Sequence, residues 1–399
     1  MFFPQEAPSL LQALRILWGD HTMVFIASLL ITLLLTPVFR ALAISLGVYD
    51  MPDQRLKPHS RPIPYLGGLA MFLGVAAPLA VVSWSGQTEH SRSLWAVLAG
   101  LTIIVTAGLL DDLVSLRPYQ KIIAQVAAAL VLVAGGVIFR GVSFQIGGVQ
   151  WMPNSPPLLL SIGVMFQVFL VVAACNATNL LDGLDGLCGG VTAIIAVGFL
   201  LLATSIAGWH MWGHAPSYQF STLIIAISLA LLGAALGFLP YNFNPASIFM
   251  GDAGSMLMGF VCATLMIMFS ERQGMLKWFV GALFIFGLPI FDTALAYARR
   301  KLNGRPVFQG DRSHFYDQLV DRGLTVRQTV LICYGLALFF AILGVGIIFM
   351  RTRYGLLVYI GVTTILAITV YKAGMLRVDP SEKTAGNPAE AGQKTEDSR

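Results

Sequence analysis

The sequence predicts an all-α fold, a polytopic membrane helix bundle with about eleven transmembrane helices. Of the 399 residues, 56% are hydrophobic and only 11% are charged, whereas a soluble domain carries about 25% charged residues. The apolar residues form long runs, and a helix needs about 20 such residues to cross a bilayer. A chain of this composition is expected to be a set of membrane helices and not one large soluble core.

Eleven apolar runs are candidate spans. No cleavable signal peptide is evident, so the first run is expected to remain as an anchor. The polar residues 377–399 are expected to be a disordered cytoplasmic tail behind a membrane domain of residues 1–376. The expected spans cover residues 23–40, 65–84, 94–110, 121–139, 157–175, 187–207, 220–238, 253–270, 278–297, 328–350 and 354–372.

Basic residues are unevenly divided between the two sets of loops. Of the 25 Lys and Arg residues, 18 lie at the C-terminal end or in loops that follow odd-numbered spans. Because cytoplasmic loops are rich in Lys and Arg, these loops are expected to face the cytoplasm, with the N-terminus outside and the C-terminus inside. The net charge of +5 favours an anionic membrane face, and no nucleic-acid partner is expected.

Acidic residues are divided between the two expected sides of the membrane even more unevenly than basic residues. Outside the tail, eleven acids lie on the expected cytoplasmic side, and every one is an aspartate. Short, stiff carboxylates suit a hard cation, so we expect a site on this side. The eleven are Asp50, Asp53, Asp111, Asp112, Asp182, Asp185, Asp252, Asp292, Asp311, Asp317 and Asp321.

Asp111 and Asp112 lie at the inner end of the third expected span, in the stretch GLLDDLVS. Two adjacent carboxylates near a low-dielectric boundary can bind Mg²⁺, or one of them can act as a base. A helix end marked only by charge is the simpler alternative.

The stretch NATNLLDGLDGLCGG carries four polar residues at intervals of three: Asn176, Asn179, Asp182 and Asp185. On a helix these positions form one winding polar strip. The glycines around them would let the helix break or let a ligand approach the backbone. Packing of small residues between helices is the alternative, but four polar groups so close together in an apolar chain favour a site.

The stretch YNFNPASIFMGDAGSM lies between two expected spans and contains Asn242, Asn244 and Asp252. Phe249 could stack on a flat base. Asp252 could also be the N-cap of the helix that follows, and the two roles are compatible.

Two basic loops are the remaining candidate site segments. The segment PIFDTALAYARRKLNGRPVFQGDRSHFYDQL joins Asp292 to a basic run that includes Arg312 and His314, which suits a diphosphate. The abundance of positive charge in cytoplasmic loops explains most of this run but not His314. The earlier loop DMPDQRLKPHSRPIPYLGG places Lys57 and Arg61 before a Gly-Gly helix start, and a solvated basic loop explains it equally well.

These blocks together resemble the polyprenyl-phosphate N-acetylhexosamine-1-phosphate transferases. The matches are the paired aspartates, NATNLLDGLDGL, FMGDAGS and the loop after PIFD, over about residues 40–330. The resemblance implies transfer of an N-acetyl-sugar 1-phosphate from a UDP-N-acetylhexosamine to undecaprenyl phosphate, with release of UMP. It implies Mg²⁺ as the cofactor, with Mn²⁺ as the alternative.

Eleven spans with a cytoplasmic tail are similar to the N-acetylglucosamine branch of that family. This branch implies GlcNAc-1-phosphate and the start of a cell-envelope glycan, such as a wall polymer or lipopolysaccharide O-antigen. Two departures from the family pattern are present: no further acid follows the pair in DDLVS, and the His-rich cluster is reduced to the sequence HFYD from His314 to Asp317.

The resemblance also implies a role for each residue. Asp111 would accept or orient the lipid-phosphate proton, and Lys57 and His314 would hold phosphates. Catalytic roles fall to Asp111, Asp112, Asp182 and His314. Metal binding falls to Asp252, Asn179 and Asp112. Substrate binding falls to Lys57, Asn176, Asn179, Asp185, Asn242, Phe249 and Arg312.

The expected location is a bacterial inner (plasma) membrane, with membrane lipids around the bundle and the site facing the cytoplasm. A homodimer is one option for the assembly. The runner-up from another class is a secondary transporter, but transporter sites lie near the bilayer midplane in repeated halves. A nearer rival is an intramembrane prenyltransferase with two Asp-rich motifs, which the FMGDAGS block and the long basic loop argue against.

Overall fold

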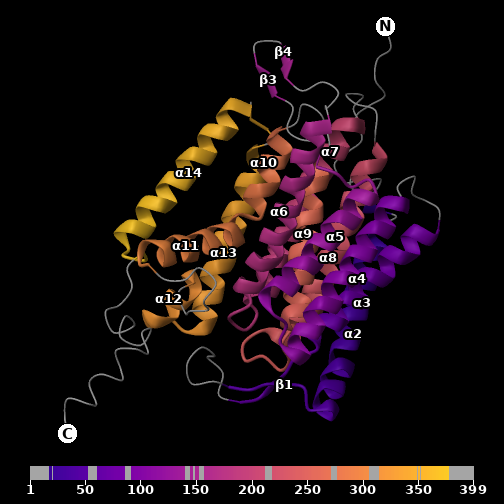
Figure 1. The fold of residues 1–399 in the computed structure, drawn as a ribbon, viewed down its shortest axis with the longest axis vertical. Helices are drawn as coiled ribbons and strands as arrows, with labels where there is room; N and C mark the ends of the chain where they lie inside the picture. Colours follow the sequence, from indigo (N-terminus) through magenta and orange to yellow (C-terminus); the bar gives the residue numbers. More distant parts are fainter. Residues whose placement is uncertain are drawn as a thin grey trace.

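The computed structural model describes residues 18–19, 21–52, 61–85, 91–139, 144–146, 149–151, 157–211, 218–270, 276–304, 314–347, 349–350 and 352–376. Within these residues the chain is a bundle of long helices with two small antiparallel hairpins (Figure 1). The predicted all-α class is therefore confirmed. The predicted tail, residues 377–399, lies outside the described residues.

The helices follow the apolar runs of the sequence, and the hairpins lie in the loops. The first hairpin pairs β1 (Tyr49–Asp50) with β2 (Ile63–Pro64), and the second pairs β3 (Phe144–Ile146) with β4 (Val149–Trp151). The helices are α2 (Thr22–Leu46), α3 (Gly67–Trp84), α4 (Ser91–Val114), α5 (Pro118–Ala134), α6 (Pro157–Leu181), α7 (Leu187–Met211), α8 (Tyr218–Asn242), α9 (Gly251–Ser270), α10 (Leu276–Ile285), α11 (Gly287–Leu302), α12 (Phe315–Asp321), α13 (Val326–Ile347) and α14 (Thr352–Lys372).

Nine helices of the described residues are long and apolar enough to cross a membrane. α10 and α11 would make a tenth span if they act together, but the chain bends by 70° between them. α5 begins at Pro118 and has 17 residues, which is short for a span. Ten of the eleven predicted spans each coincide with one helix, whereas the span predicted at residues 278–297 runs across the bend between α10 and α11, so the count of eleven is not confirmed.

α9 lies in the interior of the bundle, where every residue from Ala253 to Ser270 is buried. α4 and α6 pack along it. Small residues make this close packing feasible, as is usual between membrane helices. A side chain at Gly259 would overlap Ala174 and Thr178 of α6, for example. The helix that begins at the predicted FMGDAGS block is therefore held on several sides.

The two hairpins mark opposite ends of the bundle. In Figure 1, β3 and β4 lie at the upper end and β1 lies at the lower end, beside the lower end of α2. The β1–β2 hairpin is tied to the start of α9, because Phe249 N donates to Pro64 O at 2.9 Å and Gly67 N donates to Phe249 O at 3.0 Å. The lower end therefore joins several loops that are far apart in sequence.

Candidate active site

A cavity of about 600 Å³ lies at this end of the bundle, and we call it the aspartate cavity. Its wall contains six aspartates and, among the described residues, no Lys, Arg or His. Such a wall suits a cation or a ligand that carries one. Its residues are Tyr49, Asp50, Met51, Tyr65, Asp111, Asp112, Ser115, Asn179, Asp182, Gly183, Leu184, Asp185, Asn242, Phe249, Gly251 and Asp252.

Asp112 joins the end of α4 to the start of α9. Its Oδ1 accepts from Asp252 N at 2.8 Å, and its Oδ2 accepts from Ala253 N at 3.2 Å. The first amides of a helix lack intrahelical partners, so a carboxylate there caps the helix and meets the positive end of its dipole. Gly251 has φ of 68°, and a side chain at that position would overlap the Asp112 carboxylate.

Lys121, on the first turn of α5, bridges the other two carboxylates. Its Nζ lies 2.6 Å from Asp111 Oδ2 and 2.6 Å from Asp252 Oδ2. The tight turn between α4 and α5 brings Lys121 back to Asp111, because Leu116 N donates to Asp111 Oδ1 at 2.8 Å. One ammonium thus lies between carboxylates from two helices.

Asn179 completes the contacts of Asp252. Its Nδ2 donates to Asp252 Oδ1 at 2.8 Å and to Ser255 Oγ at 3.1 Å. With the bonds above, each of the six carboxylate oxygens of Asp111, Asp112 and Asp252 has one protein donor. A carboxylate oxygen can accept more than one bond, so each keeps capacity for a ligand.

The loop before α9 is locked to the turn between α6 and α7. Asp185 Oδ2 accepts from Asn244 Nδ2 at 3.0 Å and from Ala246 N at 2.9 Å. Asn242 Oδ1 accepts from Gly186 N at 3.1 Å. The NATNLLDGLDGLCGG and YNFNPASIFMGDAGSM blocks therefore form one wall, joined by one hydrogen bond between side chains and two from backbone amides to side chains.

Outside the membrane-spanning helices, two ionisable groups of this wall have shifted pKa values. Burial raises the pKa of the Asp182 carboxyl well above its usual range, and the nearby charges of Asp252 and Asp112 raise it further. Burial, followed by the charge of Asp112, also raises the pKa of the Tyr65 phenol. The Tyr65 hydroxyl donates to Asp112 O at 2.5 Å. Burial therefore favours the protonated form of the Asp182 carboxyl.

His314 is buried behind the wall rather than in it. Its Nδ1 lies 2.7 Å from Asp292 Oδ2, and only 4% of the residue is exposed. Burial lowers the pKa of the imidazole, but the hydrogen bond and the charge of Asp292 outweigh it, and the pKa is raised. The ring stacks on Tyr316 at 5.5 Å between centroids, and the Tyr316 hydroxyl donates to Leu180 O at 2.7 Å.

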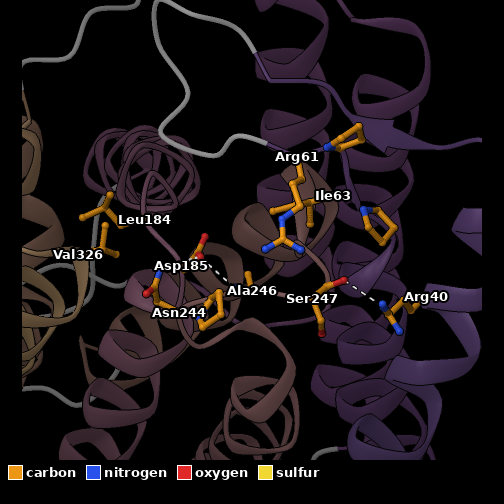
Figure 2. A pocket seen from close by; sticks show the side chains of 12 residues that line it. Arg40, Arg61, Ile63, Leu184, Asp185, Asn244, Ala246, Ser247 and Val326 are labelled. Atoms are coloured by element: carbon orange, nitrogen blue, oxygen red, sulfur yellow. Dashed lines mark hydrogen bonds between the residues drawn. The ribbon is translucent and has the colours of Figure 1, made fainter.

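A second cavity of about 480 Å³ shares Leu184 and Asp185 with the aspartate cavity. We call it the arginine cavity, because Arg40 and Arg61 line it. Figure 2 shows Arg61 extending toward its centre, while Arg40 Nε donates to Ser247 O at 3.1 Å. The remaining wall is formed by Pro62, Ile63, Pro64, Asn244, Pro245, Ala246 and Val326.

Several known proteins are similar to this chain in sequence. The family described as glycosyl transferase family 4 matches residues 94–270. A probable undecaprenyl-phosphate N-acetylglucosaminyl 1-phosphate transferase of Bacillus subtilis is 35% identical over 325 residues, 80% of this chain and 82% of that protein. A decaprenyl-phosphate N-acetylglucosaminephosphotransferase of Mycolicibacterium smegmatis is 31% identical over 376 residues, 90% of each chain. The chain belongs to the polyprenyl-phosphate N-acetylhexosamine-1-phosphate transferase family.

A phospho-N-acetylmuramoyl-pentapeptide-transferase of Heliobacterium modesticaldum is 32% identical over 275 residues, 66% of this chain and 78% of that protein. The transferase therefore has relatives in both branches of its family. Membership confirms the predicted class, a multi-pass membrane phosphotransferase that acts on a polyprenyl phosphate.

The transferase gathers most of its predicted site residues in one place. Asn176 lies beside the cavity, where its Nδ2 donates to Gln125 Oε1 at 2.9 Å. His314 is buried with Asp292, while Lys57 and Arg312 lie outside the described residues. The roles of all these residues stay predictions. Those that line the aspartate cavity are Asp111, Asp112, Asn179, Asp182, Asp185, Asn242, Phe249 and Asp252.

Three contacts of the transferase site were missed by the sequence analysis. Lys121 counted there only as a basic loop residue, although its position ten residues after Asp111 is a signal that a short turn could bring the two together. Tyr65 was not named there, and Asn244 was named without its contact to Asp185. Their contacts join residues more than 40 positions apart, which sequence spacing does not predict.

The donor set fits a divalent cation. In the part of the chain that the structure describes, no three His, Cys, Asp or Glu side chains form a ready metal-binding group. The Lys121 ammonium already lies between Asp111 and Asp252. Carboxylate and amide oxygens are the ligands that Mg²⁺ prefers, so Asp111, Asp252 and Asn179 are suited to hold it.

Proposed function

We propose that the protein transfers N-acetylglucosamine 1-phosphate from UDP-N-acetylglucosamine to undecaprenyl phosphate and releases UMP. The observation that carries this proposal is the aspartate cavity, where six carboxyls from four separate segments of the chain surround one space at the end of the bundle. The relatives named as N-acetylglucosaminyl phosphate transferases support the sugar. The site would face the cytoplasm of a bacterial plasma membrane, where lipid phosphate and nucleotide sugar meet.

The reaction is a phosphoryl transfer. An oxygen of the lipid phosphate attacks the β-phosphorus of the UDP-sugar, and the bond from that phosphorus to the bridging oxygen breaks, so UMP leaves. Little covalent chemistry is required of the protein, which must position both phosphates and neutralise their charge. Mg²⁺, or Mn²⁺ in its place, would supply the charge that stabilises the transferred group.

The contacts of each carboxylate indicate a separate role for it. Asp252 and Asn179 are proposed to hold the cation, with Asp112 keeping the start of α9 in register through its two amide bonds. Asp111 lies at the cavity wall beside this point, and is proposed to accept or orient the proton of the lipid phosphate.

The uridine of the UDP-sugar is proposed to bind near Asp185 and Phe249. Both line the aspartate cavity, and Asp185 also lines the arginine cavity. Phe249 offers a ring on which a base can stack. Arg61, which extends into the arginine cavity (Figure 2), carries a charge suited to a phosphate at the shared wall.

The transporter alternative has less support, because the aspartates lie at one end of the helices and not at their middle. Every comparison reported above is with a sugar-phosphate transferase and not with a prenyltransferase.

The test is an assay of the purified full-length protein with undecaprenyl phosphate, Mg²⁺ and a panel of UDP-sugars, with UMP as the readout. UDP-N-acetylglucosamine is expected to give the fastest release, and a chelator is expected to abolish it. Asp252→Asn is the matched control and should be slower by on the order of 10²-fold, the scale of one main electrostatic stabiliser. Release that requires UDP-N-acetylmuramoyl-pentapeptide would replace the proposed sugar. Release no faster than in Asp252→Asn with every sugar would refute the function.

A further inference from the structure

Lys121 has contacts that the proposed reaction does not yet use. Its ammonium contacts Asp111 and Asp252 from the α5 side, and its side chain is 23% exposed. Lys121 is absent from the described wall of the aspartate cavity, whereas both of its partners belong to that wall. The ammonium therefore reaches the two carboxylates from behind.

The charges around this point are unbalanced. Asp111, Asp112 and Asp252 carry three negative charges when ionised, and the Lys121 ammonium supplies one positive charge, which leaves a formal charge of −2. Carboxylates this close repel each other unless a cation lies between them. A divalent cation would remove the remaining imbalance.

We infer that Lys121 is the built-in counter-ion of the cation position: it keeps the carboxylates of Asp111 and Asp252 directed at one point, and it gives up Asp252 when a divalent cation binds. This inference rests on the metal dependence of the proposed function. It makes Lys121 a positioning residue that competes with the cation for a shared oxygen, Asp252 Oδ2.

Two consequences distinguish this role from simple structural support. Without the ammonium, the carboxylates attract a divalent cation more strongly, so the cation should bind more tightly. Without it, the same carboxylates repel each other in the metal-free protein, so that form should unfold at a lower temperature. A residue that only supports the fold would weaken cation binding when it is removed.

The experiment compares Lys121→Met with the wild-type protein in detergent, as full-length chains without substrates. Mn²⁺ binding is measured from the electron paramagnetic resonance signal of the free ion, and thermal unfolding is measured with and without Mg²⁺. Lys121→Arg keeps the charge. Lys372→Met is the matched control, because it removes one positive charge from an exposed position at the end of α14.

Lys121→Met is expected to bind Mn²⁺ about tenfold or more tightly than the wild type, because a unit charge at this separation opposes the cation strongly even near a protein surface. It is also expected to gain more thermal stability from Mg²⁺. Lys121→Arg and Lys372→Met should stay within about threefold of the wild type, since neither removes a charge from the cluster.

Unchanged or weaker Mn²⁺ binding by Lys121→Met would overturn the inference while leaving the proposed function intact. A wild-type protein that binds no Mn²⁺ would overturn both. If Lys121→Met does not fold, acetylation of the wild-type protein, followed by mass spectrometry, decides the question. Mg²⁺ should then raise the labelling of Lys121 relative to Lys372, and unchanged or reduced labelling would contradict the release of the ammonium.

Discussion

Asp112 of α4 caps α9 from a different helix, with its two carboxylate oxygens on the amides of Asp252 and Ala253. The residue that precedes it, Asp111, instead pairs with Lys121. Adjacent residues of a helix diverge by about 100°, so the two neighbours reach different partners. The paired aspartates therefore have separable functions in the fold.

The first prediction concerns this cap. Asp112→Ala should lower the free energy of unfolding by about 1–2 kcal/mol, because two helix amides lose their acceptor. Asp112→Asn keeps one oxygen acceptor and should lose less. Thermal unfolding of both variants in detergent shows whether the alanine variant loses more stability than the asparagine variant. Equal stability of the alanine variant and the wild type would show that the cap contributes nothing.

The second prediction concerns Gly183, on the wall of the aspartate cavity. A side chain there would overlap the hydroxyl and ring of Tyr316, so Gly183→Ala should lower kcat/KM by about tenfold or more through displacement of the wall. Tyr316→Phe loses one hydrogen bond, worth about 1 kcal/mol, and should cost roughly fivefold.

The double variant tests whether the two residues act together. Because Tyr316→Phe removes the nearest atom of the overlap, the loss in the double variant should be smaller than the product of the two single losses. UMP release at several UDP-sugar concentrations gives the three values. A strictly multiplicative loss would mean that the contact does not connect these residues.

The third prediction concerns the pH dependence of stability. The pKa of His314 is raised above its usual 6.5 by Asp292, so the imidazolium is favoured in the folded state. Its contribution to stability is complete below about pH 6.5 and is lost as the pH rises through the folded-state pKa. The melting temperatures of the wild type and His314→Gln, measured from pH 5.5 to 9, should therefore differ most at low pH, and the difference should shrink as the pH rises. A difference that grows with rising pH would contradict the stabilising role of the imidazolium.

The fourth prediction concerns orientation in the membrane. Ser85→Cys, after α3, should react with an impermeant maleimide in intact cells, and Lys372→Cys should react only in inverted vesicles. Both positions are exposed, whereas the four native cysteines are buried and serve as an unreactive background. The reverse labelling pattern would place the aspartate cavity outside the cell and refute the proposed substrates.

The sequence was sufficient for most of the helices and for half of the residues that line the aspartate cavity. Long apolar runs determine where helices form, and the aspartates that end these runs meet because the helices pack in one bundle. The bend between α10 and α11 was not predicted, since hydropathy carries no information on direction. The cap formed by Asp112 and the bridge formed by Lys121 were also not predicted, because both depend on which helices become neighbours.

His314 shows a different limit. Its position in a basic loop predicted a phosphate contact, but in the structure it is buried against Asp292 and Tyr316. Sequence identifies a residue type that can serve in a site, yet burial decides whether a side chain reaches the ligand or supports residues that do. Tyr316 connects His314 to the end of α6, so support of the wall is the role that its contacts favour.

The burial of α9 has a consequence for the membrane around the protein. α2 and α14 expose most of their surface, whereas α9 touches only other parts of the chain. A bilayer that is thinner or thicker than the hydrophobic length of a helix acts on the helices that lipid contacts, by tilting or shifting them. The proposed cation position lies at the start of this buried helix. Changes in lipid chain length should therefore affect the delivery of the lipid substrate before they affect the geometry of Asp252.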